Sequence, residues 1–72
     1  MQSPNDIRIM LNGQAETLPR QTTVAELIVR RGLANQRIAI ELNGGILPRS
    51  EHGNTALTDN DVIEIVHAIG GG

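Results

Sequence analysis

A strand-length run of β-branched residues near the end of the sequence does most to restrict the fold of this chain. Residues 62–68 are rich in Val and Ile, whose stiff side chains suit a pleated, half-buried strand. Shortly after this run, Gly70, Gly71 and Gly72 close the sequence. Because glycine has no Cβ, these residues can thread a channel that is too narrow for any side chain. We therefore expect a strand that anchors a slender, flexible tail over residues 70–72, with the Gly72 carboxylate as the group on which chemistry occurs.

The composition limits both the core and the class of partner. The 72 residues form one small domain and contain no cysteine and no aromatic residue, so the core must be aliphatic. A net charge of −2 and the lack of aromatic stacking platforms argue against nucleic-acid binding. No apolar run approaches the roughly 20 residues that span a bilayer, and residues 1–5 lack the features of a signal peptide. We expect a cytoplasmic monomer with no bound metal or cofactor.

The first part of the sequence predicts a β-hairpin. Apolar and polar residues alternate over 6–11, as in a half-buried strand. Asn12-Gly13 favours a tight turn because both residues accept positive φ. A return strand over 14–18 is expected to end at Pro19, which lacks an N–H donor. Residues 1–5 are polar and aperiodic, so we expect them to be frayed.

A short helix is predicted next. Thr23-Val24-Ala25-Glu26 is a capping box, in which the threonine hydroxyl and the glutamate carboxylate satisfy each other's backbone amides. Leu27 and Ile28 continue an apolar stripe that begins at Val24. Gly32 is a natural left-handed terminator. A helix of about two to three turns is marginal alone and needs a sheet to cover its apolar stripe.

The second part predicts another hairpin and a loop before the last strand. Residues 37–42 alternate again, and a turn at 43–45 leads to a short strand at 46–47. Residues 49–56 are polar and contain a glycine, so we expect a loop that carries at most one helical turn. Asn60 lies in the turn before the last strand, where it can adopt the left-handed conformation.

This order of elements predicts an α+β fold of the β-grasp, or ubiquitin-like, type. A mixed sheet of four to five strands would carry one main helix across one face, in a single domain over residues 1–72. The last strand would enter the middle of the sheet parallel to the first, which the long connection between them permits. The predicted core consists of aliphatic residues from all these elements: Ile7, Ile9, Leu11, Leu27, Ile28, Ile38, Ile40, Ile63 and Ile65.

The opposite face of the sheet is a candidate docking surface. By strand parity it carries a mixture of charged and small apolar residues: Arg8, Met10, Ala39, Glu41, Glu64, Val66 and Ala68. Met10, Val66 and Ala68 would form a small apolar patch, rimmed by charges, that leads to the tail. The alternative is that these residues are the scattered surface aliphatics found on most proteins.

Other polar residues are better explained by structural roles than by catalysis. His67 has no recognisable serine or cysteine nucleophile to activate, and His52 has no metal-ligand partner at a useful spacing; we expect His52 to face solvent. Asp59 and Asp61 lack the further oxygen ligands that calcium needs, so turn capping accounts for them. The chain is therefore interpreted as a substrate of enzymes and not as an enzyme.

Three parts of the sequence belong together: the run Asn43-Gly44-Gly45-Ile46-Leu47-Pro48-Arg49, then Leu57, and then the run from Asp59 to Gly72. These residues resemble a known family, the bacterial sulfur carriers of thiamine biosynthesis (ThiS). The resemblance covers about residues 6–72 and includes the helix start at 23–28. Asn60 replaces a glycine that is common in the family, and Glu51-His52-Gly53 stands where many members have an aromatic residue. The C-terminal block is the most specific part of the resemblance.

The resemblance implies a specific chemistry at the end of the chain. An adenylyltransferase of the ubiquitin-activating type (ThiF-like) would use ATP and magnesium to adenylate Gly72, with Gly70 and Gly71 threading the tail into its active site. A cysteine desulfurase or a similar persulfide donor would then supply the sulfur of a C-terminal thiocarboxylate. A thiazole synthase (ThiG-like) would incorporate that sulfur into the thiazole ring of thiamine.

Two alternatives remain open from the sequence. One is a carrier that resembles the small subunit of molybdopterin synthase, which has the same terminal chemistry and a different acceptor. The lead-in His67-Ala68-Ile69 and the short length favour the thiamine pathway. The other is a non-covalent ubiquitin-like interaction module with a passive glycine tail.

Overall fold

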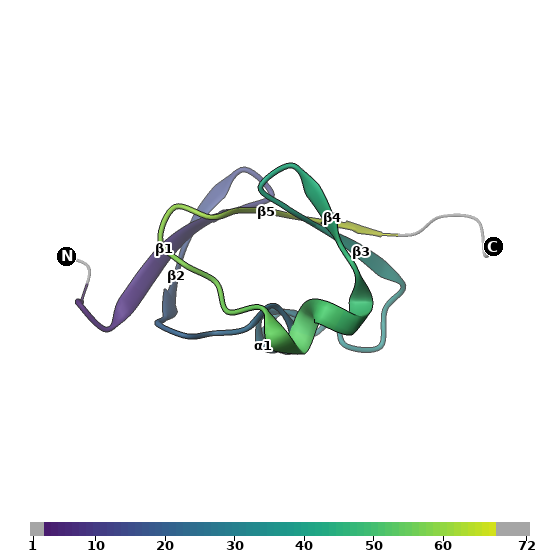
Figure 1. Cartoon of the computed structure of the whole chain (residues 1–72), viewed down its shortest axis with the longest axis horizontal. Helices are drawn as coiled ribbons and strands as arrows, with labels where there is room; N and C mark the ends of the chain where they lie inside the picture. Colours follow the sequence, from purple (N-terminus) through teal and green to yellow (C-terminus); the bar gives the residue numbers. More distant parts are fainter. Residues whose placement is uncertain (1–2, 68–72) are drawn as a thin grey trace.

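The computed structural model of the chain describes residues 3–67 (Figure 1). The predicted site residues Ala68, Gly70, Gly71 and Gly72 lie outside the described residues. In chain order the elements are β1 (Asp6–Leu11), β2 (Gln14–Pro19), α1 (Val24–Arg30), β3 (Ile38–Leu42), β4 (Gly45–Leu47), the 3-10 helix η1 (Arg49–Asn54) and β5 (Val62–His67).

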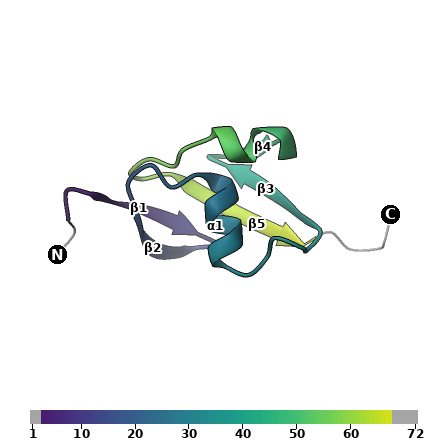
Figure 2. The same cartoon turned by 90° about the horizontal axis from the view of Figure 1, so that it is seen from below.

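The strands form one mixed sheet in the order β2-β1-β5-β3-β4. β5 lies in the middle, parallel to β1 and antiparallel to β3. The sheet arches over α1, which crosses its concave face (Figures 1 and 2). This is the predicted β-grasp arrangement, with five strands, one main helix and the last strand at the centre.

The core fills the space between the sheet and α1. Every residue that was predicted for it is buried except Ile38, which is partly buried and packs against the cluster. Three further buried residues complete it: Leu18, Val24 and Leu57. Leu57 comes from the segment before β5 and is tied to the start of the helix, because its N–H donates to the carbonyl of Thr22 (2.8 Å). Each fully buried aliphatic side chain contributes about 1.5–3 kcal/mol relative to its exposed state.

Both ends of α1 are capped as the sequence predicts. The N–H of Glu26 donates to Thr23 Oγ1 (3.1 Å), and the N–H of Thr23 donates to Glu26 Oε1 (2.9 Å). Gly32 has a φ of 73°, and the N–H of Leu33 donates to the carbonyl of Ile28 (3.0 Å) in a Schellman motif. The caps therefore confine the helix to Val24–Arg30, the segment whose apolar stripe meets the sheet.

Two segments are more ordered than the sequence suggested. The expected loop at 49–56 contains η1, which spans six residues and lies beside α1 (Figure 1). At the other end of the chain, Ser3–Asn5 forms a turn. The N–H of Arg20 donates to the carbonyl of Asn5 (2.7 Å) and its Nε donates to the carbonyl of Pro4 (3.1 Å). These bonds attach residues 3–5 to the end of β2.

Candidate functional site

β5 is the strand that leads to the glycines, and its neighbours fix it on both sides. It pairs with β1 at Met10–Val62 and Leu11–Ile63, and with β3 along five residue pairs. The side chains of Ile63 and Ile65 are buried in the core, with 0% and 8% exposure. β5, which precedes Gly70–Gly72 in the sequence, is therefore paired on both sides and anchored in the core.

Two turn asparagines extend this anchoring. Asn43 accepts a hydrogen bond at Oδ1 from the N–H of Val62 (2.8 Å), and its own N–H donates to the carbonyl of Val62 (2.7 Å). Asn12, in the turn after β1, makes a similar pair of bonds to two residues of β5. Its Oδ1 accepts from the N–H of Ile65 (2.8 Å), and its N–H donates to the carbonyl of Ile63 (3.0 Å). Asn12 and Asn43 both have positive φ, 50° and 52° respectively. The sequence predicted them only as turn residues.

The turn before β5 uses its carboxylates for structure, as the sequence predicts. Asp61 Oδ2 accepts from the N–H of Thr58 (2.8 Å), and Asp61 Oδ1 accepts from Asn43 Nδ2 (3.0 Å). Asp59 Oδ1 accepts from the N–H of Arg8 (2.8 Å). Asn60 has a φ of 72°, so it adopts the left-handed conformation that was expected of it. This network fixes the entry into β5.

The outer, convex face of the sheet carries the predicted docking residues that can be described. Met10 and Val66 are 38% and 48% exposed, but they are not in register with each other. Met10 lies opposite Val62, and Val66 lies opposite Ala39. Val62 is 46% exposed and joins the apolar row beside Met10. Val62 was not predicted for the patch, although its parity with Val66 places it on this face.

An acidic pair interrupts the apolar surface. Glu41 of β3 and Glu64 of β5 are directly opposite each other in the antiparallel register, which places their Cβ atoms about 4.5–5.5 Å apart. Within residues 3–67 neither carboxylate forms an ion pair. Along β5, Glu64 stands between Val62 and Val66. Charges were expected at the rim of the patch, whereas the structure puts this pair in its middle.

The two histidines take different positions. His67 is exposed at the end of β5, opposite Ile38. The prediction that His52 faces solvent is wrong, because His52 is half-buried and its Nε2 lies 3.3 Å from the carbonyl oxygen of Leu47. The cause is η1, which turns His52 back toward β4. His52 borders a groove of about 310 Å³ between α1 and η1, where Val29 and Leu33 provide apolar lining.

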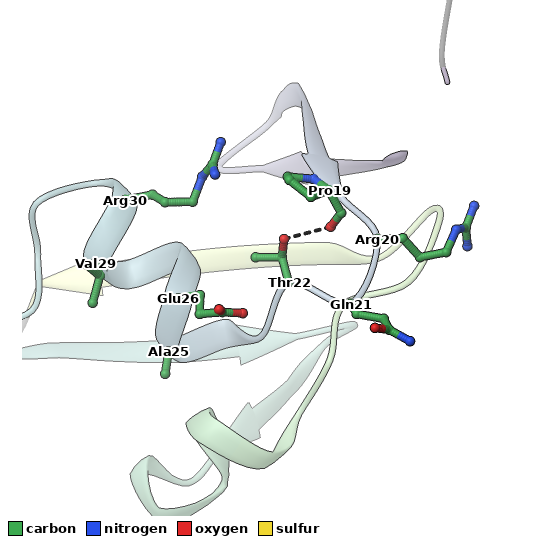
Figure 3. Close-up of a pocket in the computed structure, with 8 residues that line it drawn as sticks. All are labelled: Pro19, Arg20, Gln21, Thr22, Ala25, Glu26, Val29 and Arg30. Atoms are coloured by element: carbon green, nitrogen blue, oxygen red, sulfur yellow. Dashed lines mark hydrogen bonds between the residues drawn. The ribbon is translucent and has the colours of Figure 1, made fainter. Parts of the chain in front are cut away.

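A larger, open hollow lies along one side of α1 and the segment that precedes the helix (Figure 3). Two of its polar groups serve the fold: Thr22 Oγ1 donates to the carbonyl of Pro19 (2.6 Å), and Glu26 belongs to the capping box. Arg20 Nη2 lies 3.7 Å from Asp59 Oδ2. We therefore assign this hollow no chemistry. Its lining consists of Pro19, Arg20, Gln21, Thr22, Ala25, Glu26, Val29 and Arg30.

The comparison with known families agrees with this geometry. The model of the ThiS family matches residues 7–72, which include every strand except the first residue of β1. The chain belongs to the ThiS family. Among the helices of the described residues, none is long and apolar enough to cross a membrane.

Relatives of this chain include a sulfur carrier protein of similar length and longer thiazole synthases. The sulfur carrier protein ThiS of Bacillus subtilis is 35% identical over 65 residues, which cover 89% of this chain and 98% of that protein. The thiazole synthases of Magnetococcus marinus and Paramagnetospirillum magneticum are 36% and 33% identical over 66 residues. Those two matches include 92% of this chain, but the chain spans only 20% of the length of each synthase.

A solved structure confirms the ThiS fold. The thiamine biosynthesis protein ThiS of Geobacter metallireducens superimposes with a TM-score of 0.80 at 29% identity, over 92% of this chain and 100% of that one. The β-grasp topology and the central β5 thus agree with the match to the ThiS family model.

Proposed function

We propose that this ThiS-type sulfur carrier of thiamine biosynthesis holds its sulfur on the carboxyl group of Gly72. The observation that carries the proposal is the position of β5: the central, doubly paired strand leads within a few residues to Gly70, Gly71 and Gly72. A partner that recognises the sheet can therefore guide these glycines into its own active site.

The chemistry begins with activation of a poor electrophile. The Gly72 carboxylate attacks the α-phosphorus of ATP, which a ThiF-like adenylyltransferase binds with magnesium, and pyrophosphate leaves. A persulfide sulfur, delivered by a cysteine desulfurase or a similar donor, then attacks the acyl carbon of the adenylate and displaces AMP. A thiol reduces the resulting sulfur–sulfur bond, which leaves a thiocarboxylate on Gly72. A ThiG-like thiazole synthase is the acceptor of this sulfur.

The carrier itself contributes recognition and reach. An acyl adenylate is hydrolysed by water, so its site must be enclosed, and only a backbone without side chains enters a narrow channel. Gly70 and Gly71 supply that backbone. The outer face, on which Met10, Val62 and Val66 are exposed, supplies the docking surface.

The decisive test is chemical conversion of the chain itself. A chain that ends at Gly72 is incubated with ATP, magnesium, the adenylyltransferase and a sulfur source, and its intact mass is measured. We expect the increase that corresponds to the replacement of one oxygen atom by sulfur, and no change for a chain that ends at Gly71. An unchanged mass, under conditions that convert a known carrier, would contradict the proposal.

Threading is tested by Gly71→Ala. The added methyl group should reduce kcat/KM for adenylation by between roughly 10-fold and 100-fold, because small misplacements in an enclosed site are costly, while the melting temperature stays unchanged. Gly53→Ala is the matched control, since Gly53 has no positive φ and a Cβ added there would meet only open space. Equal adenylation rates for the two variants would show that the channel tolerates side chains.

A further inference from the structure

The outer face of the sheet gathers most of the exposed apolar side chains of the described residues. Five large apolar side chains are exposed within residues 3–67, and four of them lie on this face. Val62 and Val66 belong to β5, Met10 is in register with Val62, and Ile46 is in register with Glu41. The fifth, Val29, lies on α1. Such a concentration on one face marks an interaction surface.

The pair Glu41–Glu64 gives this surface a chemical preference. Like charges directly opposite each other in a sheet destabilise it, and no arginine of the described residues forms an ion pair with either carboxylate. A cationic side chain from outside would remove the repulsion and be held by two carboxylates at once. Two copies of this chain that packed the centres of these faces together would bring four carboxylates into contact, which disfavours self-association.

We propose that this face docks on the thiazole synthase, and that an arginine or lysine of the synthase binds between Glu41 and Glu64. Apolar residues of the synthase would cover Met10, Val62 and Val66. The inference rests on the proposed function and names the partner surface for it. The choice of partner follows from the two synthases that contain a ThiS-like unit within their own chain. In those relatives the shared chain keeps the ThiS-like unit at a high effective concentration near the rest of the synthase, which makes a thiazole synthase the partner that this face is expected to contact.

The test measures the affinity of the carrier for the purified thiazole synthase of the same organism by calorimetry. We expect Glu64→Gln to raise Kd roughly tenfold and the double variant Glu41→Gln/Glu64→Gln to raise it further. Glu51→Gln is the matched control, because it makes the same charge change on η1, and its Kd should stay within about twofold of the wild type. Added salt should weaken wild-type binding more than that of the double variant.

The apolar part of the surface has its own matched pair. Val66→Thr should raise Kd roughly fivefold. Val29→Thr makes the same chemical change on α1, outside the proposed interface, and should leave Kd unchanged. The melting temperatures of all variants are measured alongside. The double glutamine variant should melt at the wild-type temperature or above it, so that a loss of affinity cannot be attributed to unfolding.

Three results would overturn the proposal. The first is an unchanged synthase Kd for the double glutamine variant. The second is a raised KM for adenylation with an unchanged synthase Kd, which would assign the face to the adenylyltransferase. The third is a wild-type dimer, seen by sedimentation, that the substitutions dissociate. Failure of the wild type to form a thiocarboxylate, with synthase binding still dependent on Glu64, would instead contradict the proposed function and leave the docking surface standing.

Discussion

The two faces of the sheet in this protein differ in what they are built to do, although the same strands supply both. On the concave face, Ile63 and Ile65 of β5 are buried with the aliphatic core under α1 (Figure 1). On the convex face, Val62, Glu64 and Val66 of the same strand are exposed. The centre of the concave face is apolar, and Glu16 at its β2 edge is paired with Arg31. The convex face mixes apolar residues with an unneutralised acidic pair. One face therefore serves stability, and our proposal assigns recognition to the other.

Among the variants that test this difference between the faces, Ile63→Ala should have the largest effect on the free energy of unfolding. The side chain is fully buried, so its truncation removes apolar contacts and leaves a cavity that costs about 2–5 kcal/mol. Since a small domain has about 5–15 kcal/mol of total stability, the variant should show a much lower urea midpoint. Val62→Ala, one residue away on the convex face, should change the free energy of unfolding by about 0.5 kcal/mol or less. Equal losses for the two variants would refute the division between faces.

The anchoring asparagines should show an intermediate effect. Asn43→Ala loses the hydrogen bond from the N–H of Val62 and puts alanine at a φ of 52°; we expect a loss of about 1–3 kcal/mol in the free energy of unfolding. Asn43→Gly keeps the turn conformation and loses only the side-chain bonds, so it should be destabilised by less. Chemical denaturation of both variants separates the two contributions. If the glycine variant were as unstable as the alanine variant, the backbone conformation would contribute nothing.

Most of the fold could be predicted because its determinants are local. The alternation over 6–11 and 37–42, the Asn-Gly turns and the capping box at Thr23 each act within a few residues, and they define elements that the structure confirms. The burial of Val24 and Leu57 completes a core that the same periodicity outlines.

What could not be predicted depends on partners far apart in the sequence. Asn12 bonds to Ile65, 53 residues away, and no local pattern shows that its side chain reaches the central strand. The pairing of Glu41 with Glu64 requires the register between β3 and β5, which hairpin turns do not set because these strands are not consecutive. His52 was misplaced for a different reason, since its contact with Leu47 arises from the 3-10 geometry of η1, where a loop was expected.

Glu64→Gln should have the smallest effect on the free energy of unfolding, and it tests whether the acidic pair on the convex face lowers stability. Glu64→Gln keeps the size of the side chain and removes the repulsion with Glu41, so it should raise the free energy of unfolding by about 0.2–0.5 kcal/mol, the lower part of the range for such pairs because the site is exposed. For a domain of this size the melting temperature should rise by about 1–4 °C. The rise should shrink in high salt, which screens the two charges. Glu51→Gln, made at a site on η1, should show no such salt-dependent gain. A gain in stability at Glu64 that accompanies a loss of synthase affinity is the pattern of a residue retained for binding, whereas a fall in stability would mean that the pair is neutralised within the chain and has no need of a partner.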